Sequence, residues 1–255
     1  MKTTRFGRRI LFSKKVDSTN DWAKQLANYG AEEGTVAVAD TQSCGRGRLA
    51  RDWVSPSGGL WFSIVLRPKV SVADAAKLVF VVSLAVAKVL DKKHGLKTET
   101  KWPNDVLIGG RKVCGILAEM KTVGDVVDFV VVGIGVNANF NVKDALPEAL
   151  KNTATSLRRE LGRDVSLGAL FSVLLEKIEC LYDRFVNEGF GPILNEWKKY
   201  ASFLGHDVEV SCLEEKVSGV ALDVDNDGAL ILRLEDGVVA RLFAGDLSLR
   251  MKEQS

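Results

Sequence analysis

Residues 42–63 read QSCGRGRLARDWVSPSGGLWFS, and this stretch holds both a candidate site and the start of a core strand. Arg46, Arg48 and Arg51 crowd into one short segment although like charges repel, and glycines separate them although ordering glycine costs entropy. Glycines let a backbone approach a ligand closely, and arginine binds carboxylate or phosphate through a two-pronged fork. The stretch therefore predicts an anion-binding loop that leads into a buried strand over residues 60–66.

This loop has two other interpretations. A solvated basic loop that only connects strands is the simpler one, and Arg/Gly loops also contact nucleic acid. The formal net charge of the 255-residue chain is +2, which is too small to indicate a nucleic-acid binder by bulk charge. The 46% hydrophobic and 27% charged residues are typical of a globular protein with a well-filled core.

Cysteine usage and apolar stretches bear on the compartment. The sequence has four widely spaced cysteines, Cys44, Cys114, Cys180 and Cys212. No C-x-x-C pair occurs, so reduced thiols are favoured over a zinc site or a disulfide framework. The basic N-terminal residues lack the apolar core of a signal peptide, and the longest apolar stretch contains three charged residues. We therefore expect a cytoplasmic protein that does not associate with membranes.

Hydrophobic patterning predicts a mixed α and β architecture for most of the chain. We expect strands over residues 9–16, 35–40, 60–66, 98–102, 106–108, 112–120 and 126–136. We expect helices from the cap at residues 17–19 to Gly30, and over residues 72–94, 167–188 and 192–203.

The pattern changes near Gly205. Beyond it we expect only short strands, over residues 207–212, 216–224, 229–234, 238–242 and 247–250. Two Asp-Gly pairs between them are strong hairpin signals, and such a meander is typical of a small barrel. We therefore predict two domains: residues 1–204 form a larger mixed domain, and residues 205–255 form a small β-barrel.

Two further segments contain candidate site residues. In KWPND, Pro103 orients Asn104 and Asp105 just after a strand, although an ordinary turn is the simpler interpretation. In GRKVCGILAEM, Lys112 starts a strand and Gly115 lies inside it. A glycine inside a strand often marks close approach by a ligand, whereas an isolated lysine usually faces solvent.

The segment VVGIGVNAN ends an apolar strand with Gly-x-Gly-x-Asn, which could place Asn137 beside a base or a sugar. It is not a dinucleotide fingerprint, because the third glycine is missing and no helix follows directly. A Walker-type phosphate loop and a G-x-S-x-G elbow are also absent from the sequence. His94 and His206 have no partner at triad or metal spacing, so we assign them no chemistry.

The order of these motifs is more specific than any one of them. D-S-T-N, Q-x-x-G-R-G-R-x-x-R-x-W, K-W-P-N-D, G-R-K-x-x-G-I-L-x-E, G-I-G-V-N and T-S-L follow one another along the chain. This series resembles the biotin–protein ligases, from about Arg9 to the C-terminus. The resemblance implies an α+β fold: a mixed-sheet catalytic domain of the class II aminoacyl-tRNA synthetase and biotin ligase type, then a Src homology 3-like barrel.

The resemblance also implies the reaction. Such ligases condense biotin with ATP to biotinyl-5′-AMP and pyrophosphate, and then pass biotin to one lysine of a biotin carboxyl carrier domain. Mg²⁺ is the implied metal, with unknown ligands, and a homodimer that does not bind DNA is the implied assembly. Because the biotin-pocket segment starts at Ser18, we expect the short class without a winged-helix repressor domain.

Residue roles are carried over from the matching motifs. Biotin and biotinyl-AMP binding is implied for Ser18, Thr19, Asn20, Gln42, Gly45, Arg46, Gly47, Arg48, Trp53, Lys112 and Gly115. Catalytic roles are implied for Lys112, Arg48, Asp105 and Arg51. Nucleotide binding is implied for Arg51, Asn104 and Asn137. Cys44 and Ala154 depart from the usual family residues, but neither is expected to abolish activity.

Three other interpretations compete with this resemblance. Lipoate–protein ligases share the fold and the acyl-adenylate logic, but the loop with Trp53 and the KWPND segment favour biotin. A nucleic-acid-binding regulator would need more positive charge and a helix-turn-helix pattern. The third alternative is an interaction module built on the C-terminal barrel; we expect instead that this barrel supports the nucleotide site and helps to dock the carrier.

Overall fold

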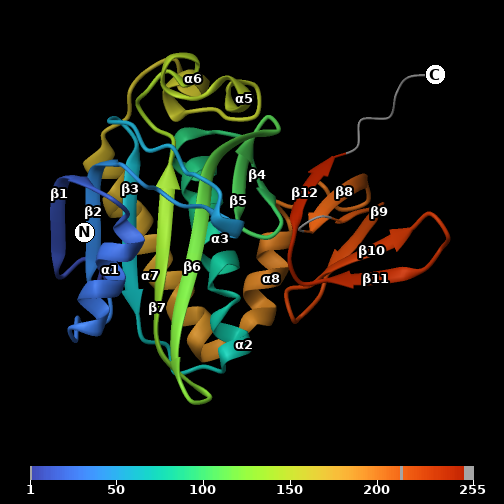
Figure 1. The fold of residues 1–255 in the computed structure, drawn as a ribbon, viewed down its shortest axis with the longest axis horizontal. Helices are drawn as coiled ribbons and strands as arrows, with labels where there is room; N and C mark the ends of the chain where they lie inside the picture. Colours follow the sequence, from blue (N-terminus) through green and yellow to red (C-terminus); the bar gives the residue numbers. More distant parts are fainter. Residues whose placement is uncertain (1, 213–214, 250–255) are drawn as a thin grey trace.

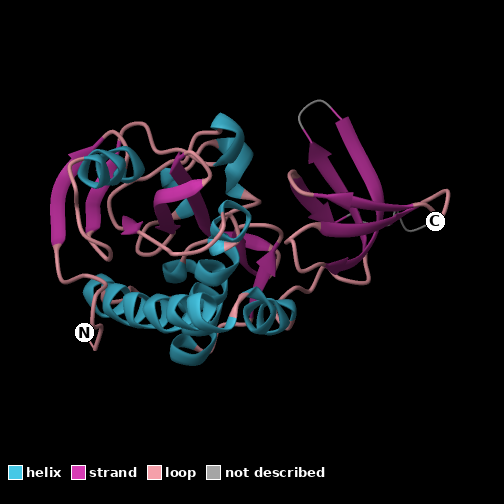
Figure 2. Cartoon of the chain, turned by 90° about the horizontal axis from the view of Figure 1, so that it is seen from below, coloured by secondary structure: helices cyan, strands magenta, loops and turns pink. Residues whose placement is uncertain are grey.

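The computed structural model describes residues 2–212 and 215–249 of the chain. A seven-stranded mixed sheet, in the order β1-β2-β3-β7-β6-β5-β4, forms the larger part (Figure 1). A five-stranded antiparallel sheet, in the order β11-β10-β9-β8-β12, forms the smaller part. The helices gather on the large sheet, and the small sheet stands to one side (Figure 2). The predicted α+β class, with a small C-terminal barrel of the Src homology 3 type, is confirmed.

The strands of the large sheet agree closely with the predicted ranges. They are β1 Ile10–Val16, β2 Val36–Gln42, β3 Leu60–Leu66, β4 Thr98–Lys101, β5 Asp105–Ile108, β6 Arg111–Val123 and β7 Val126–Val136. Only β1 and β2 pair in parallel; the other neighbours are antiparallel. The predicted hairpin at Gly109-Gly110 joins β5 to β6, and both glycines have positive φ.

The main helices are α1 Thr19–Asn28, α3 Leu78–His94, α7 Leu167–Glu188 and α8 Phe190–Lys198. Short helices lie at α2 Val72–Ala75, α4 Val142–Ala145, α5 Glu148–Lys151 and α6 Leu157–Leu161, with a 3₁₀ turn η1 at Arg48–Ala50. Helices α3, α7 and α8 cover one face of the sheet, and α1 lies on the other (Figure 1).

Alternation along the strands separates the two faces of the large sheet. In β7, Val132, Ile134 and Val136 join the main apolar cluster with α3 and α7. The intervening Gly133 and Gly135 face the opposite side, beneath Asn20 and Trp53. Because successive strand side chains point to opposite faces, one strand builds both the core and the floor of a site.

The single helix predicted over residues 72–94 is wrong, since α2 ends at Ala75 and α3 begins at Leu78. At the break the Lys77 amide donates to Asp74 and the Phe80 amide to Lys77, so tighter i→i−3 bonds replace the helical ladder. The Lys77 ammonium lies 2.9 Å from Asp74 Oδ1 and 5.2 Å from the Phe190 ring centroid. These two partners hold the lysine at the break.

Other boundaries also differ from the prediction. The helix predicted over residues 192–203 is α8, which starts at Phe190 and ends at Lys198, where turns follow and the Tyr200 carbonyl accepts from Thr100. Three short helices were not predicted. Two of them, α4 and α6, are capped at their starts by Asn141 and Ser156, and the third is α5.

The small sheet comprises β8 Asp207–Cys212, β9 Glu215–Val224, β10 Leu230–Leu234, β11 Val239–Leu242 and β12 Asp246–Leu249. Arg250, the end of the last predicted strand, lies outside the described residues. The elements of the two sheets fall on either side of the proposed boundary between residues 1–204 and 205–255. The Trp102 indole donates to the Gly228 carbonyl at 3.0 Å and ties the barrel to the large sheet.

Two observations bear on the expected compartment. In the described part of the chain, no helix has both the length and the apolar character that a membrane crossing requires. Cys44, Cys114 and Cys180 are free thiols, while the side chain of Cys212 lies outside the described residues.

Candidate active site

A cavity of about 680 Å³ opens on the glycine-bearing face of the large sheet, within the usual size range of ligand pockets. The Arg/Gly loop, the start of α1, strands β4 to β7 and the barrel strand β12 all contribute to its lining. The sequence-predicted residues that line it are Ser18, Thr19, Asn20, Gln42, Arg46, Gly47, Arg48, Arg51, Trp53, Asn104, Asp105, Lys112, Gly115 and Asn137. Gly45 is the one predicted residue outside this lining.

The polar end of the cavity is built at the start of α1. The Ser18 hydroxyl accepts from the Asp21 amide and caps the helix. The amide and hydroxyl of Thr19 donate to Gln42 Oε1 at 2.8 and 3.1 Å. The Ser63 hydroxyl lies 2.6 Å from Asn20 Oδ1. These bonds fix the side chains as a rigid set of donors and acceptors, which suits recognition of an amide-like ligand group.

Glycines form the floor of the cavity. A Cβ added to Gly133 would lie 2.0 Å from Asn20 Oδ1, and one added to Gly135 would lie 2.5 Å from Trp53 Nε1. One added to Gly115 would lie 2.9 Å from the Trp53 ring. No other residue fits these positions without displacing a pocket side chain. At Gly115 the close neighbour is the ring of Trp53, and approach by a ligand there stays a prediction.

The Arg/Gly loop folds back on itself as a narrow ribbon. The Gly47 amide donates to the Arg51 carbonyl at 2.7 Å, and the Trp53 amide donates to Gly45 at 2.8 Å. A Cβ on Gly45 would lie 2.3 Å from the Trp53 carbonyl, so glycine is required where the two arms meet. At the tip, Leu49 has φ of 53°, a region that non-glycine residues rarely adopt.

The three loop arginines have different partners. Arg46 Nη2 donates to Asp21 Oδ1 at 2.6 Å, away from the other two arginines. Arg48 Nη1 donates to Asn104 Oδ1 at 3.3 Å and to the Gly245 carbonyl at 3.2 Å. Arg51 forms an ion pair with Asp246 of the barrel. The barrel therefore holds the tip of the loop over the cavity.

A carboxylate between two lysines lies deeper in the cavity. Lys112 Nζ is 2.8 Å from Asp105 Oδ1 and 5.0 Å from the centroid of the Trp53 ring. Asp105 and Lys112 come from neighbouring strands β5 and β6, so the sheet sets their spacing. Burial, and then the positive charges of Lys112 and Arg51, hold the pKa of Lys101 below its ordinary value despite the attraction of Asp105.

The two predicted asparagines are largely buried. Asn104 Nδ2 donates to the Ile116 carbonyl at 2.6 Å, which leaves its oxygen to face Arg48. Asn137 Nδ2 donates to the Thr155 carbonyl at 2.9 Å and to the Lys112 carbonyl at 3.3 Å. Each amide therefore joins segments that are distant in sequence. Each also lines the cavity.

Several residues of the site were not predicted. Lys101, in the KWPND motif, had no predicted role, although it shares the open face of β4 with Glu99. The lining residues of β12, among them Asp246, belong to a separate sheet, and no local signal marks them. The basic side chains that line the cavity are Arg46, Arg48, Arg51, Lys101 and Lys112. Acidic side chains also line it, namely Asp52, Glu99, Asp105 and Asp246. The arginine and lysine groups can bind an anion, while the polar end orients a neutral polar group.

Two stretches of the chain match known families. Residues 12–137 match the "Biotin/lipoate A/B protein ligase family", and residues 203–250 match the "Biotin protein ligase C terminal domain". The fold and the site thus define an enzyme of the ligase class. The first match covers the loop, the glycine floor and both pocket lysines, and the second covers the barrel.

Two named relatives show which kind of ligase this chain resembles. The bifunctional ligase/repressor BirA of Bacillus subtilis is 36% identical over 98% of this chain and 76% of its own length. The biotin–[acetyl-CoA-carboxylase] ligase of Paracoccus denitrificans is 35% identical over 86% of this chain and 92% of its own length. The chain belongs to the biotin protein ligases.

Solved structures agree with this assignment. The biotin protein ligase of Aquifex aeolicus in complex with biotin and ATP superposes with a TM-score of 0.81. It is 31% identical to this chain, and the match covers 95% of this chain and 99% of that one. The likeness spans both sheets, including the barrel that closes the cavity.

Proposed function

We propose that this chain joins biotin to ATP as biotinyl-5′-AMP and then transfers biotin to a lysine of a biotin carboxyl carrier domain. The observation that carries the proposal is the single cavity that joins a polar end, a glycine floor and a basic end. Biotin has a neutral urea group, apolar rings with an apolar side chain, and a carboxylate that would join the ATP phosphates. These three parts would need the three environments in this order.

In this proposal the urea head of biotin lies at the polar end. Ser18, Thr19 and Gln42 would bind it, because their donors and acceptors are already oriented by hydrogen bonds. The glycine floor leaves room for the rings, and the face of Trp53 provides apolar contact.

Adenylation brings two anions together, since the biotin carboxylate attacks the α-phosphorus of ATP. Lys112 and Arg48 would offset this repulsion, because both line the same part of the cavity as Asp105 and Asn104. Arg51 would contact the phosphates when its pair with Asp246 opens. Fixed cations of this kind stabilise charge that develops in the transition state without further reorganisation.

Magnesium would enter as the MgATP substrate. Among the described residues, no group of three or more His, Cys, Asp or Glu side chains could hold a metal ion. Mg²⁺ bound through substrate phosphates needs only one or two protein carboxylates, so the residues present suit a metal that arrives with the nucleotide. Asn137, on the floor side, would contact the nucleotide.

The second step needs a neutral amine on the carrier lysine. Asp105 is the carboxylate that would orient this amine or accept its proton, since it lies beside Lys112 at the end of a rigid hairpin. We expect Asp105→Ala to slow transfer from preformed biotinyl-5′-AMP. Unchanged transfer would show that another group has this role.

Assembly and location are parts of the same proposal. We propose a homodimer in the cytoplasm; the unpaired edge strand β1 supports self-association, because Phe12 on it is 66% exposed. Light scattering after gel filtration gives the molar mass. Binding to duplex DNA at low salt tests the expectation that DNA is not a partner.

The central test is ATP–pyrophosphate exchange with Mg²⁺, with biotin or lipoate as the acid. We expect exchange with biotin alone, followed by label transfer to a carrier domain. Exchange with lipoate but not biotin would identify a lipoate ligase. Folded protein without exchange would show that the cavity binds other ligands.

A further inference from the structure

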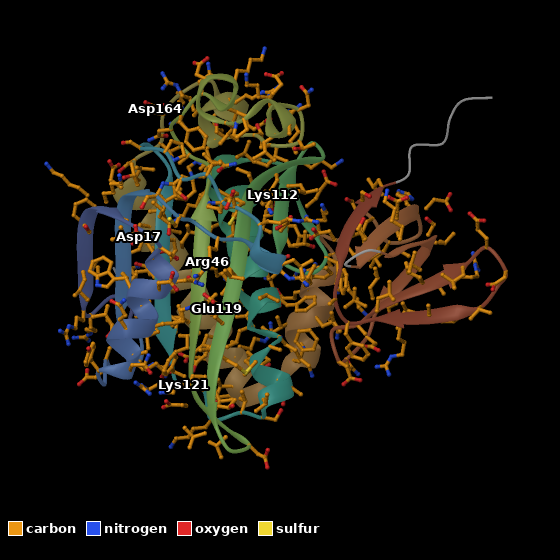
Figure 3. All side chains as sticks on the ribbon, viewed as in Figure 1. Asp17, Arg46, Lys112, Glu119, Lys121 and Asp164 are labelled. Atoms are coloured by element: carbon orange, nitrogen blue, oxygen red, sulfur yellow. The ribbon has the colours of Figure 1, made fainter. Side chains whose placement is uncertain are left out.

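Arg46 is set apart from the other loop arginines. Its Nη2 lies 2.6 Å from Asp21 Oδ1 and 3.4 Å from both carboxylate oxygens of Glu119. Arg48 and Arg51, by contrast, reach toward Asn104 and the barrel. The first arginine is therefore bound to carboxylates of this chain at the base of the loop, where the loop meets α1 and β6 (Figure 3).

Asp21 is the nearer of the two carboxylates, and Glu119 is the one that also contacts Asn20. Glu119 Oε2 accepts from Asn20 Nδ2 at 2.8 Å, and its Oε1 lies 2.9 Å from Lys24 Nζ. It stands on β6 four residues after Gly115, so alternation places it on the face of the cavity. It is not among the cavity-lining residues, so it acts on the site only through its neighbours.

The contacts of Glu119 determine how Asn20 presents its amide. The side-chain nitrogen of Asn20 faces Glu119 and the Leu117 carbonyl, and the side-chain oxygen of Asn20 faces the Ser63 hydroxyl. Although burial favours the neutral form of Glu119, hydrogen bonds from Asn20 and Lys24 hold its pKa below the ordinary value. The ionised carboxylate accepts hydrogen bonds only, so it fixes both the amide orientation and the arginine fork.

We propose that Glu119 is a positioning residue for biotin: it orients Asn20 and, through Arg46, anchors the base of the Arg/Gly loop over the biotin end of the cavity. The Arg46 guanidinium is then an anchor rather than a phosphate ligand. The inference rests on the proposed biotin–ATP chemistry and assigns the loop two functional ends. The anchored end sets biotin affinity, and the barrel-linked end serves the phosphates.

The kinetic test compares Glu119→Gln with wild type in biotin-dependent pyrophosphate exchange. Loss of a charge-assisted contact predicts a KM for biotin raised by about tenfold to a hundredfold. The KM for ATP and the kcat at saturating biotin should stay within twofold of wild type. A KM for biotin within twofold of the wild-type value would overturn the proposal. Equal rises in the KM for biotin and the KM for ATP, together with a lower kcat, would also overturn it.

Arg46→Met is a second variant, for the case that Glu119→Gln does not fold. The Arg46 side chain is 38% exposed, so its replacement should leave the fold intact. An anchor predicts the same biotin-specific rise in KM, and a double variant little worse than either single one. A phosphate ligand predicts instead a higher KM for ATP and a lower kcat. The second pattern would refute the anchoring role.

The matched control is Asp128→Asn. Asp128 lies on the neighbouring strand β7 and pairs with Arg67 at 3.2 Å and Lys121 at 3.6 Å, away from the loop. We expect it to leave both KM values unchanged. A biotin-specific rise in this control would show that loss of any strand carboxylate perturbs the pocket, and would contradict the proposal.

Trypsin cleavage after Arg46 and Arg48 gives a readout independent of the reaction. In the ligand-free protein, Glu119→Gln should be cut in the loop several-fold faster than wild type and Asp128→Asn. Equal cleavage rates would overturn the anchor. The two proposals can fail separately. If the wild type shows no biotin-dependent exchange but the cleavage rates still differ, the proposed chemistry is wrong and the anchoring role is supported.

Discussion

The two faces of the large sheet show how one set of strands can serve two physical purposes. Toward α3 and α7, β7 presents Val132, Ile134 and Val136, all fully or nearly fully buried. Toward the cavity the same strand presents Gly133 and Gly135. The first face gains stability from apolar burial, and the second gives up that burial to leave room for a ligand.

The two faces also differ in how they treat charge. The buried ionisable groups of the helix layer, Lys77 and Glu179, each have their own partners, whereas the cavity face holds Lys101, Lys112 and Asp105 close together. Such groups are costly to bury and must be paired, which they are in part by one another. Stability and chemistry are thus separated by strand alternation, so substitutions on the two faces should have separable effects.

The largest effect is expected on the cavity face. Lys112→Met should lower the kcat of biotin-dependent pyrophosphate exchange by about 10²–10³-fold, because a fixed cation at the reacting anions is lost. The midpoint of thermal unfolding should change little. Lys121→Met, on the same strand but distant from the cavity, is the control; a comparable loss there would contradict the separation of functions (Figure 3).

The helix face should show the opposite pattern. Ile64→Ala, on the neighbouring strand β3, is expected to lower the free energy of unfolding by about 2–5 kcal/mol, because a buried side chain outside the cavity lining is lost and a void remains. Urea denaturation measures this change. The KM for biotin should remain within twofold at a temperature where the variant is folded, and a large rise would show that the faces are coupled.

A side chain added to the glycine floor tests the space reserved for the ligand. Gly133→Ala would place a Cβ 2.0 Å from Asn20 Oδ1, so Asn20 must move. We expect a raised KM for biotin and a loss of stability of about 1–3 kcal/mol. Gly168→Ala is the control, since that α7 position is open and alanine favours a helix. An unaffected biotin KM in Gly133→Ala would rule out a tight floor.

The smallest effect is expected at a carboxylate of the helix layer. Glu179 accepts from the backbone amides of Thr4, Arg5 and Phe6. Burial raises the pKa of Glu179, but these hydrogen bonds together lower it by more, so the net pKa lies below the ordinary value.

A lowered folded-state pKa means that the stabilisation by Glu179 is complete above its unfolded-state pKa of about 4.3. The stabilisation is then lost as the pH falls through the folded-state value. Glu179→Gln should cost about 1 kcal/mol at neutral pH and progressively less in acid. Urea titrations at pH 7 and pH 3 measure the difference, and a cost that grows in acid would contradict the assignment.

Local patterns determined most of the secondary structure. The continuous apolar runs of β3 and β7 and the amphipathic pattern of α7 were predictable to the residue, because their periodicity is strong. The break at Lys77 was not predictable. It depends on Asp74 and on the ring of Phe190, which lies more than a hundred residues away in the chain.

The sequence by itself determined most of the polar residues that line the cavity, because the order of short motifs is specific to one family. Only the tertiary structure decided how charge is distributed among them. Arg46 and Arg48 are two residues apart, yet one pairs with Asp21 and the other with Asn104. Their partners come from α1 and from the turn between β4 and β5, and neither local propensity nor spacing specifies which partner each arginine meets.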